Sequence, residues 1–312
     1  MSFRGQGECI DPELNVDGKS VSSKGYITDL LSSHAVDFLK AQERSKPFCL
    51  YLAQKAIHPN IQQKSDGSID LDASNRAEYF IPAERHRNLY AGMVPPRRGN
   101  YLKVPRNKPA LEKTPAGTVP LGATSDAAIL ARMRMMRAVD KSMGAIVETL
   151  EKQGMLDDTM VVLSSDHGYF YGEHCLGPER RLAYEEAIRI PMLVRYPKRF
   201  AARSRPGQLV LNVVVSATAL ELAGVALPKP IDGRPLWSKQ HRDAVMVEYF
   251  SDTVFPRIRN MRYRAVRTEQ WKCVQYSELL GADEVYDLKA DPLELNHLIG
   301  DRRAPVEELS RN

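Results

Sequence analysis

The sequence predicts an α/β fold followed by a small antiparallel sheet, and three observations point to it. Stretches with apolar residues at helical spacing alternate with short continuous apolar runs, the pattern of helices packed on buried strands. After about residue 240 the pattern changes to short strands separated by turns. The 312 residues suffice for one large domain and a smaller one. We therefore expect an α/β domain over 1–238 and an α+β subdomain over 239–312.

In the first part of the chain we expect a loop, a helix, a strand and a long connection. Residues 1–25 show no periodicity and predict a loop, and apolar residues at helical spacing predict a helix at about Tyr26–Gln42. The apolar run at 48–53 predicts a strand buried on both faces. Residues 59–123 are rich in Pro, Gly and Arg, which predicts a long functional loop with a short helix near 83–91.

The clearest helix is expected at about Ser125–Gln153, with Gly154 as its stop signal. Its methionine-rich stripe is typical of a core-facing surface. Buried strands are predicted at 160–164 and 190–196, and a strand end with a helix at 210–224. The antiparallel sheet is expected to consist of four short strands, namely Ala244–Tyr249, Tyr263–Thr268, Trp271–Tyr276 and Val285–Leu288.

Composition excludes several classes of protein. With 43% hydrophobic and 27% charged residues the chain is not disordered, and no stretch is apolar enough to cross a membrane. The net charge of +5 is spread along the chain. It therefore predicts no basic surface that binds nucleic acid, but it suits an anionic substrate. Four cysteines, none in a CxxC pair, argue against a zinc ribbon or thioredoxin-like site. We expect mostly buried free thiols.

Asp166 and His167 follow the apolar run 160–164 in the motif Ser-Asp-His-Gly. Open α/β sheets place their ligands at the carboxyl ends of strands, and a carboxylate beside an imidazole can bind a divalent cation. The same letters also occur in a turn with a local Asx hydrogen bond, so the motif by itself leaves both interpretations open.

Two further groups of residues carry possible chemistry. His58 and Lys55 directly follow the apolar run 48–53, where a histidine can act as a general acid or be an ordinary loop residue. Arg180 and Arg181 lie between Gly-Glu-His and Tyr-Glu-Glu motifs. Guanidinium groups bind tetrahedral oxyanions in bidentate fashion, although an Arg-Arg pair also occurs on solvated surfaces.

Taken together, these motifs resemble the sulfatase family of the alkaline-phosphatase-like superfamily. The resemblance rests on SDHG, GEH, YEE and IRIP in this order, with a C-terminal YDL–DP–E–N box, and it covers about residues 25–301. It implies a sulfatase-like sandwich with a central mixed sheet and a small antiparallel C-terminal subdomain. It also implies a hydrolase that cleaves sulfuric esters.

The resemblance implies a role for five residues. Asp166 and His167 match half of the family's calcium site, and His58 matches the histidine that is expected to protonate the leaving oxygen. Arg180 stands four residues before Tyr184, where sulfatases usually carry a sulfate-binding Lys. Because holding sulfate needs only a fixed positive donor, we assign Arg180 to the substrate, with Arg181 as the fallback. Lys55 is a further candidate for sulfate binding, or a residue of the neighbouring loop.

The sequence also departs from the family pattern. None of its cysteines or serines stands in the C/S-x-P/A-x-R motif that yields the formylglycine nucleophile, and no buried strand that ends in two adjacent Asp residues supplies the other half of the calcium site. The resemblance therefore implies a fragment, truncated at its N-terminus, that is inactive by itself. Its parent is expected to be periplasmic or secreted, although the chain shows no signal peptide.

Several functional interpretations remain open at this point. The expected substrate is a sulfate ester, with sulfated glycans among the candidates, and nucleic acid is excluded as a partner. Alternatives are a phosphodiester or phosphonate hydrolase of the same superfamily, or a non-catalytic remnant that binds sulfated glycans. The basic residues of the loop 59–123 either border the substrate pocket or lie on a solvated insertion; these are Arg85, His86, Arg87, Arg97 and Arg98.

Overall fold

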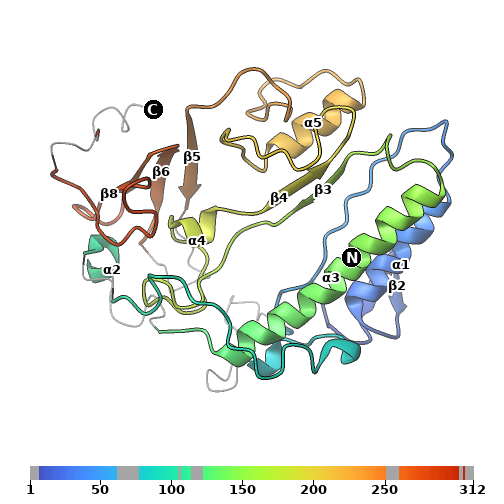
Figure 1. The fold of residues 1–312 in the computed structure, drawn as a ribbon, viewed down its shortest axis with the longest axis horizontal. Coiled ribbons are helices and arrows are strands. Elements are labelled where there is room, and N and C mark those ends of the chain that lie inside the picture. Colours follow the sequence, from blue (N-terminus) through green and yellow to red (C-terminus); the bar gives the residue numbers. More distant parts are fainter. Residues whose placement is uncertain are drawn as a thin grey trace. The chain divides into compact units, whose positions relative to one another are not determined.

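The computed structural model describes residues 7–61, 77–104, 107–113, 122–250, 260–301 and 305 (Figure 1). The chain divides into two compact units, which we describe separately. The first unit comprises residues 1–96 and 124–161, and the second unit comprises residues 97–123 and 162–312. The domain boundary expected near residue 238 stays a prediction.

Two helices form the core of the first unit, α1 (Ile27–Lys40) and α3 (Asp126–Lys152), which lie side by side in Figure 1. Both were predicted within two residues at each end. The Ser125 hydroxyl caps α3 by accepting a hydrogen bond from the Ala128 amide at 3.3 Å. Gly154 follows the helix with a φ of 63°, a backbone conformation that favours glycine. The two helices bury Ala35, Leu39, Ile146 and Leu150 between them.

The expected loop at 1–25 contains a hairpin that the sequence analysis missed. Strands β1 (Glu13–Val16) and β2 (Lys19–Ser22) pair in antiparallel fashion. Asp17 and Gly18 form the two-residue turn with φ values of 49° and 85°, as a type I′ turn requires. The Asp-Gly dipeptide was therefore the available signal.

The prediction of a buried strand at 48–53 is wrong. The segment belongs to no assigned strand, and its side chains are alternately half-buried and exposed. Phe48, Leu50 and Leu52 pack against the helical core, whereas Tyr51 is 89% exposed. The apolar side chains of segment 48–53 thus cover one side of the α1–α3 pair. Among the described residues, no strand pairs with this segment.

The long connection at 59–123 also differs in detail. The short helix expected near 83–91 is a single 3-10 turn, η2 (Glu84–His86). A five-residue helix, α2 (Pro109–Lys113), belongs to the second unit and was not predicted. Residues 62–76 of this connection lie outside the described residues.

Strand β3 (Val161–Ser164), which belongs to the second unit from Val162 on, pairs with β4 (Met192–Arg195). Both strands were predicted. The expectation that they are fully buried is wrong, because their side chains are half-buried or exposed and Leu193 is 65% exposed. Helix α4 (Glu185–Ile188) lies between them in sequence. Helix α5 (Val214–Leu222) occupies the predicted 210–224 segment, without the expected strand end.

The predicted four-stranded antiparallel sheet is confirmed. Its order is β5 (Ala244–Tyr249), β6 (Tyr263–Thr268), β7 (Trp271–Tyr276) and β8 (Glu284–Asp287). The largest buried cluster of this unit joins the sheet to the segment 170–187 through Phe170, Tyr184, Tyr276 and Tyr286, among other residues. The segment that contains the GEH and YEE motifs is therefore fixed by packing on the sheet.

The thiols only partly follow the prediction. Cys9 and Cys273 are buried, Cys175 is half-buried and Cys49 is exposed, and all four are free. No helix among the described residues is long and apolar enough to span a membrane.

Candidate active site

Asp166 and His167 form a compact pair in the turn after β3. The Asp166 carboxylate accepts a hydrogen bond from the His167 amide at 3.0 Å, and its other oxygen lies 3.2 Å from His167 Nε2. His167 Nδ1 lies 2.8 Å from the Gly168 carbonyl oxygen. A proton on Nδ1 satisfies that carbonyl and leaves the Nε2 lone pair beside the carboxylate, which is the arrangement of an imidazole metal ligand. The Asp166 side chain is 83% exposed and thus accessible.

The backbone of α4 clamps this turn. The Gly168 amide donates to the Ala187 carbonyl at 2.7 Å, and the Tyr169 amide donates to the Glu186 carbonyl at 2.8 Å. A Cβ at position 168 would overlap the Glu186 carbonyl oxygen. Only glycine therefore allows this close approach of the two backbones, and residues 166–167 are held in place through it.

Glu186 is itself held by a buried polar cluster. Its side chain is 4% exposed, and one carboxylate oxygen lies 3.0 Å from both Asn100 Nδ2 and Arg98 Nη1. The other oxygen lies 3.4 Å from His174 Nε2. Burial raises the pKa of the Glu186 carboxyl, but hydrogen bonds from His174 and Asn100 outweigh it, so that the pKa falls to about 2. Glu186 is therefore ionised and anchors the helix that clamps the turn.

The described residues contain one group of three possible metal ligands, namely His174, Glu186 and Glu294. Their ligand atoms lie within 4.8 Å of one another. However, Glu186 pairs with Arg98, and Glu294 pairs with the buried Lys272. Because each carboxylate already has a cation, charge balance does not require a metal ion here.

Arg180 and Arg181 differ in their surroundings. The Arg181 guanidinium lies 3.1 Å from the buried Glu179 carboxylate and is largely enclosed. The backbone amides of both arginines donate to the same Glu179 oxygen, at 2.7 and 3.0 Å. Glu179 thus fixes the loop and engages the side chain of Arg181, and the assignment of Arg180 to the substrate stays a prediction.

In the first unit, Lys55 and His58 lie in one turn. The His58 amide donates to the Lys55 carbonyl at 2.9 Å, and both side chains contact the Pro59 carbonyl oxygen, at 2.9 Å from His58 Nδ1 and 3.2 Å from Lys55 Nζ. The contact of Nδ1 orients the ring and directs proton exchange with a ligand to Nε2. Burial lowers the pKa of the Lys55 ammonium, partly offset by Cys9 and Glu8.

The basic residues of the long connection fall into two sets. Arg85 makes a bidentate pair with Asp29 at 2.6 Å and 2.6 Å, and Arg87 pairs with Glu84. In the second unit, Arg97 donates to the Tyr171 carbonyl at 2.9 Å, and Arg98 pairs with Glu186. The prediction that these residues border a substrate pocket stays untested, but Arg97 and Arg98 contact the segment that supports the Asp166–His167 turn.

The five predicted site residues thus form three local groups. Asp166 and His167 are adjacent, Lys55 and His58 share a carbonyl, and Arg180 lies on the Glu179-fixed loop. Calcium prefers about six to eight oxygen ligands. The donor set of Asp166 and His167 suits part of such a site only, and these two residues join no group of three ligands among the described residues. Asn100 was missed altogether, because an isolated Asn carries no sequence signal.

Comparison with protein families decides the classification. A family model described as "Sulfatase" matches residues 5–225, about seven tenths of the chain. The chain belongs to the sulfatase family. A second model, described as "N-sulphoglucosamine sulphohydrolase, C-terminal", matches residues 172–310. Both the expected family and the expected fold class are confirmed.

Individual relatives agree with this classification. The chain is 27% identical to an N-acetylglucosamine-6-O-sulfatase of Bacteroides thetaiotaomicron, over 95% of this chain and 62% of that protein. It is 30% identical to an arylsulfatase of Volvox carteri, over 90% of this chain and 49% of that protein. A solved structure of a protein in complex with its substrate D-glucosamine-2-N,6-O-disulfate matches 98% of this sulfatase chain and 72% of that chain. The TM-score is 0.80 and the identity 25%. The chain therefore spans about half to two thirds of the curated relatives' length.

Proposed function

We propose that this sulfatase chain contributes to a hydrolase that removes sulfate from sulfated carbohydrate. The observation that carries the proposal is the Asp166–His167 pair, exposed at the end of β3 and clamped by α4. The names of the relatives support the substrate class, because one is an N-acetylglucosamine-6-O-sulfatase and a similar structure holds a glucosamine disulfate.

Each of the five residues has a proposed role in the reaction. Asp166 and His167 would hold a calcium ion, which when bound supplies positive charge opposite the sulfate group. Arg180 and Lys55 bind the sulfate oxygens as cationic donors. His58, held through Nδ1, protonates the departing alcohol oxygen from Nε2. The nucleophile is not supplied by the printed sequence, which contains no C/S-x-P/A-x-R motif.

The proposal is tested on the chain joined to a sulfatase N-terminal segment that carries this motif. Alkyl or sugar sulfates need a proton on the leaving oxygen, whereas nitrophenyl sulfate barely does. His58→Ala should therefore slow a sugar 6-sulfate by about 10²–10⁴-fold and nitrophenyl sulfate much less. Arg180→Ala should slow both substrates by similar factors, as should Asp166→Ala, which removes a metal ligand.

Equal losses for His58→Ala on both substrates would contradict its role as the acid. Parallel assays with phosphodiesters and phosphonates decide the alternative within the superfamily, since faster turnover of these would overturn the sulfatase assignment. If the joined protein carries formylglycine and turns over no substrate but binds sulfated sugars, the interpretation as a non-catalytic remnant holds instead. An exported location, periplasmic or secreted, also stays a proposal.

A further inference from the structure

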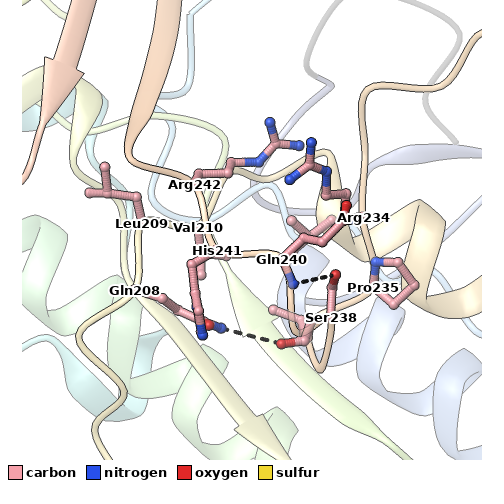
Figure 2. Close-up of a pocket in the computed structure, with 11 residues that line it drawn as sticks. Gln208, Leu209, Val210, Arg234, Pro235, Ser238, Gln240, His241 and Arg242 are labelled. Atoms are coloured by element: carbon pink, nitrogen blue, oxygen red, sulfur yellow. Dashed lines mark hydrogen bonds between the residues drawn. The ribbon is translucent and has the colours of Figure 1, made fainter.

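The second unit contains a cleft that the proposed reaction does not use (Figure 2). Segments 206–210 and 234–243 line two adjoining hollows that share four residues, Gln208, Leu209, His241 and Arg242. The smaller hollow, which Arg234 lines, has a volume of about 30 Å³, and the larger one, which Arg242 also lines, has a volume of about 500 Å³. None of the five predicted site residues lines either hollow.

The cleft is built on α5 by specific contacts. The Thr218 hydroxyl on this helix accepts a hydrogen bond from the Leu236 amide at 3.0 Å. The Leu236 carbonyl in turn accepts one from Gln208 Nε2 at 3.2 Å, which joins the two lining segments. Gly233 passes so close to the Val213 carbonyl that a Cβ would overlap it. The walls are therefore fixed by packing and hydrogen bonds.

Positive charge dominates the smaller hollow. Its lining includes Arg234, His241 and Arg242 and contains no Asp or Glu. Figure 2 shows the guanidinium groups of both arginines on the same side of the pocket. Arg242 donates to the Asp232 carbonyl, and among the described residues neither arginine forms an ion pair with a carboxylate. Asp243 and Glu269 line the larger hollow, where Glu269 pairs with Lys289.

Two arginines that share a pocket without a carboxylate repel each other, and a bound anion relieves this repulsion. The planar fork of each guanidinium matches the oxygens of a sulfate or phosphate group. The side chains of Gln208 and Gln240 and the hydroxyl of Ser238 add neutral hydrogen-bonding groups of the kind that contact sugar hydroxyls.

We propose that this cleft binds a sulfo group of a sulfated saccharide outside the reaction centre, with Arg234 and Arg242 as its main contacts. The saccharide part of this proposal rests on the proposed function, whereas the anion-binding part does not. A second contact of this kind lets an enzyme hold a chain that carries several sulfo groups while it processes one of them.

Binding is measured by calorimetry on the chain itself, so the test needs no turnover. The ligands are a heparin-derived hexasaccharide, its desulfated counterpart, inorganic sulfate, inorganic phosphate and a DNA oligonucleotide of similar charge. The double variant Arg234→Ala/Arg242→Ala should weaken hexasaccharide binding by at least about tenfold. The matched control is Arg262→Ala/Arg264→Ala, which removes one exposed arginine just before β6 and one within it, and should change hexasaccharide affinity less than about twofold.

The outcomes separate the parts of the proposal. Equal weakening by the two double variants, or unchanged binding in Arg234→Ala/Arg242→Ala, would overturn the site. Equal binding of the DNA and the hexasaccharide, or preference for phosphate over sulfate, would overturn the saccharide assignment. The loss of affinity on Arg234→Ala/Arg242→Ala should persist in a chain that also carries Arg180→Ala, so a failure of the catalytic assignment does not imitate a failure here. Circular dichroism confirms that each variant is folded.

Discussion

Replacing Glu186 with Gln is expected to destabilise the second unit by about 3 kcal/mol at pH 7. The carboxyl pKa lies at about 2 in the folded chain against an ordinary value of 4.5. At about 1.4 kcal/mol for each pKa unit, this difference corresponds to about 3 kcal/mol of stability carried by the ionised form. The group is 4% exposed, so solvent screens the interaction little.

The sign of the pH dependence follows from the direction of this shift. Since the pKa is lower in the folded state, the unfolded chain binds the proton first when pH falls through about 4.5. The stabilisation is therefore complete above pH 5 and lost as pH falls toward 2, with about 2 kcal/mol gone by pH 3. Glu186→Gln has no such proton, so the stability gap between the two proteins should narrow over this range.

Urea unfolding at pH 7, 5 and 3 measures this gap. Tryptophan fluorescence reports on the second unit alone, because both tryptophans, Trp237 and Trp271, belong to it. The control is Glu269→Gln in the second unit, whose exposed carboxylate pairs with Lys289 and should matter little. A gap that stays constant between pH 7 and pH 3 would refute the reasoning, as would an equal effect of the control.

Three further outcomes follow from the structure and the sequence. Gly168→Ala should destabilise the chain by at least about 2 kcal/mol in thermal unfolding, because its Cβ overlaps the Glu186 carbonyl. Gly144→Ala in the open middle of α3 should instead stabilise the chain by about 0.5–1 kcal/mol. Similar effects of the two substitutions on stability would show that α4 does not hold the backbone at Gly168 closely. The 312-residue chain should not hydrolyse nitrophenyl sulfate, and chelator-sensitive turnover by the pure chain would contradict this. Calorimetry should find calcium binding weaker than about 0.1 mM, since Asp166 and His167 supply two ligands, whereas sub-micromolar affinity would reveal a complete site.

The sequence by itself determined the two long helices, α1 and α3, and the C-terminal sheet. Long periodic stretches with a cap and a stop, such as Ser125 to Gly154, fix a helix through local interactions that neighbouring residues provide. Alternating strands linked by short turns likewise pair with their sequence neighbours. The motif SDHG was predicted to follow a strand, and Asp166 and His167 do follow β3, whereas their role as metal ligands stays a prediction.

Only the tertiary structure decided which residues surround and support that pair. The apolar run 48–53 indicated that the segment would be at least partly buried. However, a strand needs a partner backbone, and this segment packs against helices α1 and α3 instead. The motifs GEH and YEE could be recognised in the sequence. However, the contacts of Glu186 with His174, Asn100 and Arg98 join residues that lie far apart in the chain. Such contacts depend on how the segments pack on the C-terminal sheet, and packing is a property of the whole chain that no local pattern encodes.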